Sequence, residues 1–145
     1  MVQAARSGKQ NIVEAVGESD TTKKNEIKLL GISKGSFEEL LADYEDFLRG
    51  RGSEILPKTH AKVLQFRALG YELSNLRNLS DLGNLRKKPE LPPSSDDGAN
   101  YLLTLCHMET FLLNKQIEAM IQKFEKEGGF SEQLLKKRLK SRNNY

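Results

Sequence analysis

Apolar side chains recur every three or four residues along two long stretches of the chain. Over residues 22–49 two neighbouring stripes of this kind run side by side, and residues 94–126 repeat the pattern. Because an α-helix turns once in about 3.6 residues, this spacing gathers the apolar side chains on one side of a helix. The pattern therefore predicts two long helices. They are marked by Ile27, Leu30, Phe37, Leu41 and Leu48 in the first, and by Leu103, Cys106, Leu113, Ile117 and Phe124 in the second.

Shorter helices are predicted around these two. Residues 1–16 carry apolar positions at helical spacing, and Gly17 is a typical helix stop. Pro57, which is tolerated in the first turn of a helix, marks the start of another. Between residues 73 and 85 leucine recurs every third residue. Because a helix turn takes about 3.6 residues, leucines at this spacing would spread around a helix and would not share one face. We interpret that stretch as a helix end and a loop, and we expect a last short helix after Ser131.

Composition favours the same fold class. The chain has 145 residues, among them 22 Leu against ten Val and Ile together, and Leu suits helices whereas β-branched residues suit strands. We predict an all-α protein: an up-and-down antiparallel four-helix bundle over residues 1–130, and a basic tail over residues 131–145. The first half of the 94–126 helix is apolar nearly all round, which indicates burial between several neighbours or at a subunit contact. We therefore expect a homo-oligomer.

The positive charge is concentrated at the C-terminal end. The net charge is +3, yet residues 131–145 alone carry +4, which leaves −1 for residues 1–130. Three interpretations of this basic cluster stay open: phosphate contacts with RNA or DNA, docking on a membrane or a partner through Leu135 and Leu139, and a solvated end. Arg6 and Lys9, on the first predicted helix, are secondary candidates. The candidate nucleic-acid contacts in the tail are Lys136, Lys137, Arg138, Lys140 and Arg142.

The chain carries no signal of export or membrane insertion. Its single cysteine excludes an internal disulfide, and the N-terminal residues lack the pattern of a signal peptide. No apolar run approaches the roughly 20 residues that span a bilayer. We expect a cytoplasmic protein with no membrane partner.

No group of residues meets the demands of a catalytic or metal site. Residues 31–35 (GISKG) match the G-x-S-x-G nucleophile motif, but that motif needs a strand and a sharp turn before a helix. Here it lies within a predicted helix, and we interpret its small residues as a place where another helix approaches. Cys106 and His107 are neighbours on different helix faces, so we expect a core thiol and a polar edge residue. We expect no enzyme activity, no cofactor and no metal.

Four blocks together resemble a known family. They are residues 5–14 (ARSGKQNIVE), 26–40 (EIKLLGISKGSFEEL), 43–48 (DYEDFL) and 127–130 (EGGF). In this order they resemble the bacterial four-helix-bundle proteins found in intervening sequences of large-subunit ribosomal RNA genes, and more closely the branch with a four helix bundle suffix. The resemblance covers nearly the whole chain outside residues 73–93.

The resemblance implies an up-and-down four-helix bundle and no catalytic residues. A relative of the family is the accessory variability determinant of diversity-generating retroelements, which forms a pentameric barrel, works with a reverse transcriptase and binds nucleic acid. The resemblance thus implies a pentamer. Family members usually have a complete helix before the block that begins at Ala5, whereas Met1 falls at that point without a helix cap. We expect a shortened chain whose bundle exposes an apolar groove.

These observations lead to two functional hypotheses. The first is a non-catalytic oligomeric bundle that serves as an accessory nucleic-acid-binding or ribonucleoprotein component. The second is a structural scaffold that binds a protein partner or only itself. The net charge of −1 over residues 1–130 favours the second, because a nucleic-acid-binding core is usually basic.

Overall fold

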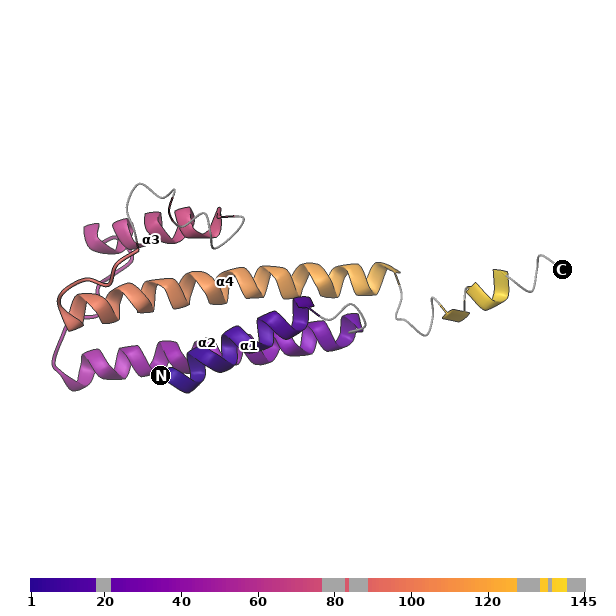
Figure 1. Ribbon diagram of the computed structural model, residues 1–145, viewed down its shortest axis with the longest axis horizontal. Coiled ribbons are helices and arrows are strands. Elements are labelled where there is room, and N and C mark those ends of the chain that lie inside the picture. Colours follow the sequence, from indigo (N-terminus) through magenta and orange to yellow (C-terminus); the bar gives the residue numbers. More distant parts are fainter. Residues whose placement is uncertain (18–21, 77–82, 84–88, 128–133, 136, 141–145) are drawn as a thin grey trace.

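The computed structural model describes residues 1–17, 22–76, 83, 89–127, 134–135 and 137–140. Its main elements are the helices α1 (Val2–Gly17), α2 (Lys23–Gly50), α3 (Ala61–Ser74) and α4 (Ser95–Glu127), drawn in Figure 1. Every regular element within these ranges is helical. The predicted fold class, an all-α protein of four main helices that pack together, is therefore confirmed.

The core of the molecule lies between α1, α2 and α4. Three clusters of buried side chains follow one another along its length, and two of them contain a residue from each of these helices. Figure 1 shows that α2 runs antiparallel to both α1 and α4. The middle cluster is Ala4 with Leu40 and Cys106; on one side of it lies Ala15 with Leu30 and Leu113, and on the other lies Leu48 with Ala99 and Leu103.

Helices α1 and α2 approach closely at a glycine and a serine. The Ser33 hydroxyl, fully buried, donates a hydrogen bond of 2.8 Å to the carbonyl oxygen of Gly8. A Cβ atom on Gly8 would lie 2.7 Å from Cε2 of Phe37, so a larger residue would push the helices apart. Ser33 is the central residue of the G-x-S-x-G sequence and lies within α2, so the prediction that another helix approaches there is confirmed for Ser33 but not for the two glycines. Its two glycines, Gly31 and Gly35, face open space.

Helix α3 packs on the side of α4 that faces away from α1 and α2. The rings of Phe66 and Tyr101 meet edge to face with centroids 5.1 Å apart. One turn further along, a Cβ on Gly70 would lie 2.7 Å from the sulfur of Met108. Both contacts advance in the same direction along the two helices, so α3 runs parallel to α4, which the sequence pattern did not predict. This second packed side explains why the first half of α4 is apolar nearly all round.

Asn100, which is buried in α4, anchors the segment that joins α2 to α3. Its side-chain oxygen accepts a hydrogen bond of 2.9 Å from the backbone N–H of Leu56. Its side-chain nitrogen donates to the carbonyl oxygens of Glu54 and Asp96, each at 3.0 Å. One amide thus satisfies backbone groups of the connection and of α4 at once, which fixes the path of the chain across the start of α4.

Two aspartates in the first turn of α4 strengthen this junction. Asp96 accepts hydrogen bonds from the Ser53 hydroxyl (2.7 Å) and from Arg51 (2.9 Å), and these bonds hold the pKa of its carboxyl below the usual value. Asp97 pairs with the Lys62 ammonium at 2.7 Å. The acids also suit the positive end of the helix dipole.

The observed helix ends agree with the predicted ones within a few residues, except at α3. We expected this helix to begin at Pro57, but it begins at Ala61, and His60 caps it by accepting the N–H of Lys62 at 3.2 Å. Pro57 instead follows the non-helical segment that Asn100 holds by hydrogen bonds to Glu54 and Leu56, so the predicted start of this helix was wrong. Helix α3 ends at Ser74, and most of the leucine-rich stretch lies outside the described residues.

We predict that the buried serine matters more for stability than its exposed neighbour. Ser33→Ala removes the hydrogen bond to Gly8 and should lower the free energy of unfolding by about 1 kcal/mol. Ser36→Ala, whose hydroxyl bonds to the exposed Ser7 at 3.2 Å, is the matched control and should change it by less than about 0.5 kcal/mol. Urea unfolding followed by circular dichroism measures both, and equal losses would contradict the proposed role of Ser33.

Candidate functional site

A crevice of about 820 Å³ lies between α3 and α4. This volume falls in the range of roughly 300–1,000 Å³ that is typical of small-molecule sites. Most of the side chains that line it are apolar. Leu105, Met108 and Leu112 contribute from α4, and Val63 and Tyr71 contribute from α3. The close contact between Gly70 and Met108 makes the crevice narrow at its base.

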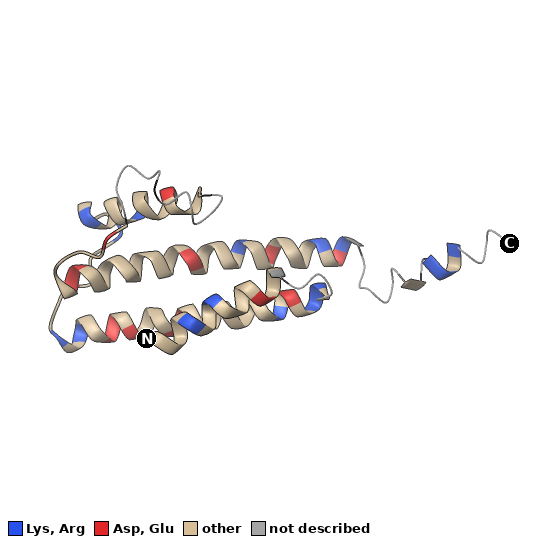
Figure 2. Cartoon of the chain, in the orientation of Figure 1, with Lys and Arg blue, Asp and Glu red and all other residues tan. Residues whose placement is uncertain are grey.

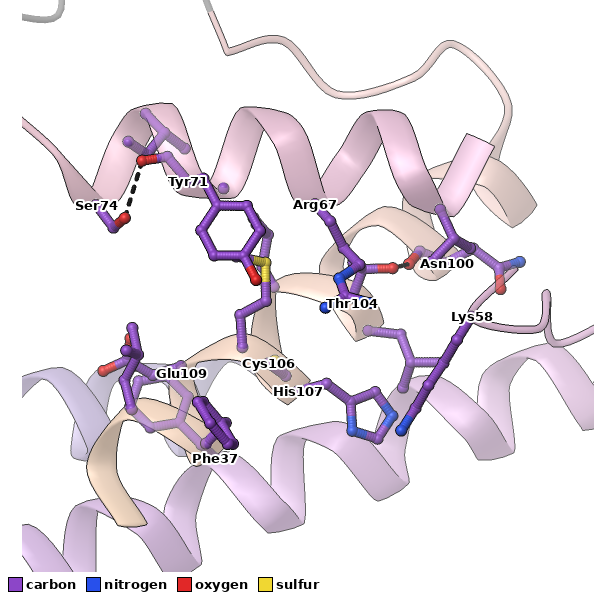
Figure 3. Close-up of a pocket in the computed structure, with 18 of the residues that line it drawn as sticks. Phe37, Lys58, Arg67, Tyr71, Ser74, Asn100, Thr104, Cys106, His107 and Glu109 are labelled. Atoms are coloured by element: carbon purple, nitrogen blue, oxygen red, sulfur yellow. Dashed lines mark hydrogen bonds between the residues drawn. The ribbon is translucent and has the colours of Figure 1, made fainter. Parts of the chain in front are cut away.

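Charged side chains sit at opposite ends of this crevice. Figure 3 shows Lys58 and Arg67 on the side nearer the start of α4, with the Lys58 ammonium beside the His107 imidazole. Glu109 lies toward the other side, next to Phe37. Within the described ranges neither Lys58 nor Arg67 forms an ion pair. The crevice is therefore apolar along its length and cationic at one end.

The pKa values of two groups reflect these surroundings. Burial lowers the pKa of His107, the positive charge of Lys58 lowers it further, and Glu45 acts in the opposite direction. Burial raises the pKa of Glu109. His107 thus favours its neutral form, and Glu109 is a half-buried carboxyl that gains no compensating ion pair from the described residues.

Cys106 and His107 occupy the positions that the sequence predicted. Cys106 is buried in the core, where desolvation raises the pKa of its thiol to about 11. A thiol with that pKa stays protonated near neutral pH and is a poor nucleophile. His107 lies at the edge of the crevice, where its side chain is partly exposed to solvent. In the part of the chain that the structure describes, no three His, Cys, Asp or Glu side chains gather as metal ligands would.

The predicted nucleic-acid contacts fall into two separate groups. Lys137, Arg138 and Lys140 are exposed on a short helical segment at residues 137–140, whereas Arg6 and Lys9 are exposed on α1. Lys136 and Arg142 lie outside the described residues.

Further lysines lie at one end of the bundle, where α2 begins and α4 finishes (Figure 2). Lys24 and Lys28 on α2 and Lys126 on α4 are exposed, and none of them forms an ion pair with another described residue. Glu26 and Glu125 share this end, so its charge is mixed. Sequence reasoning missed this cluster because it considered each helix separately; the antiparallel order of α2 and α4 would have indicated it.

Elsewhere the cations are mostly paired within the fold. Arg49 bridges Glu45 and Asp46, and the other pairs join residues three or four apart on a helix or fasten the start of α4. These pairs are Lys34–Glu38, Lys115–Glu118, Arg51–Asp96 and Lys62–Asp97. The cations without an ion pair among the described residues therefore lie on α1, at the end of the bundle where α2 begins, in the crevice and in residues 137–140.

Comparison with known proteins found no matching family model, no matching curated protein and no matching solved structure. Beyond the all-helical architecture of four main helices, nothing in these comparisons supports the family resemblance. Among the described helices, none is long and apolar enough to cross a membrane.

We predict that Glu109 makes the stability of the protein depend on pH. Its folded-state pKa is raised above the unfolded value, so the folded state binds the proton more tightly and stability falls as pH rises through that folded pKa. Glu109→Gln removes this loss and should raise Tm by about 1–3 °C at pH 7, with no gain below about pH 4.5.

Thermal unfolding between pH 4 and pH 8 measures this difference. Glu125→Gln, at an exposed position on the same helix, is the control and should not alter the slope of Tm against pH. If Glu109→Gln has the same slope of Tm against pH as the parent protein, Glu109 does not cause the pH dependence and the prediction is wrong.

Proposed function

We propose that the protein is a non-catalytic, nucleic-acid-binding accessory protein that contacts phosphates through its basic C-terminal segment. The observation that carries the proposal is the exposure of Lys137, Arg138 and Lys140, none of which forms an ion pair with another described residue. Unpaired cations gain most from phosphate because no internal partner has to be displaced, and each contact releases counterions.

The residue types favour contact with the backbone of a nucleic acid over reading of its bases. Within residues 131–145 the only aromatic side chain is Tyr145, and base stacking relies on aromatic platforms. Lys24, Lys28 and Lys126 at the adjoining end of the bundle extend the cationic surface toward the tail. Binding of this kind depends strongly on salt and weakly on sequence.

The resemblance to the four-helix-bundle family supports the same proposal, because a relative of that family binds nucleic acid. Self-association, which we also propose, would bring several tails together. Linked weak contacts bind far more tightly than one tail alone, which would compensate for the small number of cations on each chain.

The rival proposal is a scaffold that binds a protein partner. It is favoured by the large apolar side chains that remain exposed on α3 and α4, such as Tyr71 (54% exposed) and Phe111 (60% exposed). It is also favoured by the net charge of −1 over residues 1–130.

We predict that three cations account for much of the salt dependence of binding. Lys137→Gln, Arg138→Gln and Lys140→Gln together remove three phosphate contacts, so the slope of log K against log salt concentration for single-stranded RNA should decrease in magnitude by about 2. Titration of fluorescently labelled RNA and DNA across a salt series measures this slope.

The matched control keeps the charge and changes the side chains: Lys137→Arg, Arg138→Lys and Lys140→Arg together. Its salt slope should equal that of the parent, because the slope depends on the number of phosphate charges neutralised, and three Lys or Arg side chains neutralise the same number. If the parent protein binds neither RNA nor DNA at low salt, the nucleic-acid proposal is wrong and the scaffold proposal takes its place.

A further inference from the structure

The crevice between α3 and α4 has the features of a site for a slender apolar molecule. Leu105, Met108 and Leu112, spaced three and four residues apart on α4, line one wall of the crevice, and Tyr71 lines it from α3. Figure 3 shows the Tyr71 ring turned from α3 toward the crevice. At the base, the near contact of Gly70 with Met108 leaves no room for a helix, which is about 10 Å across with its side chains. An alkyl chain is narrow enough to enter without separating α3 from α4.

The cationic end of the crevice determines the polar group that such a molecule would carry. Lys58 and Arg67 line this end without ion-pair partners among the described residues, whereas the nearby cations Arg51 and Lys62 are held by Asp96 and Asp97. Arg67 is half-buried and lies beside Thr104, where water screens its charge less than at an open surface. A guanidinium in this setting suits a carboxylate, which it can bind through two parallel hydrogen bonds.

We propose that the α3–α4 crevice binds a single-chain aliphatic carboxylate, with the chain along Leu105, Met108 and Leu112 and the carboxylate at Lys58 and Arg67. This site is separate from the nucleic-acid surface proposed above, and neither proposal depends on the other. Glu109, at the far end, faces the end of the chain and not the carboxylate. The exposed lip of the crevice, which includes Leu112 at 48% exposure, is covered when the chain is bound.

Calorimetric titration of the full chain with decanoate, at concentrations below micelle formation, tests the proposal. Decanoate should bind at least about tenfold more tightly than decyltrimethylammonium, which has the same chain and the opposite charge. It should also bind roughly tenfold more tightly than octanoate, because burial of two further methylene groups strengthens binding by that factor.

Two glutamine variants test the charge of the site, and a third variant blocks its opening. Arg67→Gln should weaken decanoate binding about tenfold, whereas Glu109→Gln, which lines the same crevice, should not weaken it. Leu112→Glu places a carboxylate at the lip and should abolish binding while circular dichroism shows the helices intact.

The two histidines provide an independent readout by NMR titration. The ammonium of Lys58 lowers the pKa of His107, and the carboxylate of Glu45 on α2 raises it. A carboxylate bound near Lys58 would likewise raise the pKa of His107. His60, which caps α3 through Nδ1, serves as the reference and should change little.

Three results would overturn the proposal. The first is equal affinity for decanoate and decyltrimethylammonium, and the second is unchanged decanoate binding in Arg67→Gln. The third is a combination of two findings: decanoate does not bind, and sedimentation shows a dimer that Leu112→Glu dissociates. The crevice would then be an interface between two copies of the chain.

Discussion

Helix α4 must bury two opposite sides, and the rest of the structure follows from this constraint. One side carries Leu103, Cys106 and Leu113 into the core with α1 and α2. The other side presents Tyr101 and Met108, which α3 covers. Because the cost of exposing apolar area grows with that area, α4 needs partners on both sides, and α3 supplies the second one. The Asn100 amide makes this possible by guiding the chain from α2 across the start of α4.

The long helices were predictable because their signals are local. Apolar spacing alone defines α2 and α4, and the Ser94 hydroxyl at the start of α4 accepts the N–H of Asp97 at 3.2 Å. The start and direction of α3 were not predictable in this way. They depend on bonds from Asn100 to residues more than 40 positions away in sequence, which no window of neighbouring residues contains.

The two candidate sites also differ in whether their residues are close together in the sequence. The basic tail is a run of similar residues and is visible in the sequence, whereas the crevice is assembled from separate segments. Lys58 comes from the α2–α3 connection, Arg67 from α3 and His107 from α4, and each is unremarkable in its own segment. The one available signal was the nearly all-round apolar start of α4, which indicated a further neighbour without identifying it. The lysines of α2 and α4 likewise become one surface only through antiparallel packing.

The attachment of α3 has a consequence for how the molecule opens. Helix α3 packs mainly on α4, while α1 and α2 form their own extensive contact with each other and with the core. Amide hydrogens of α3 can therefore exchange with solvent through a partial opening that leaves the α1–α2–α4 layer intact, at a lower free energy than global unfolding. The crevice is lost whenever α3 detaches from α4. The fraction of molecules in which α3 is packed on α4 therefore determines how often the crevice is present, and the stability of the whole chain does not.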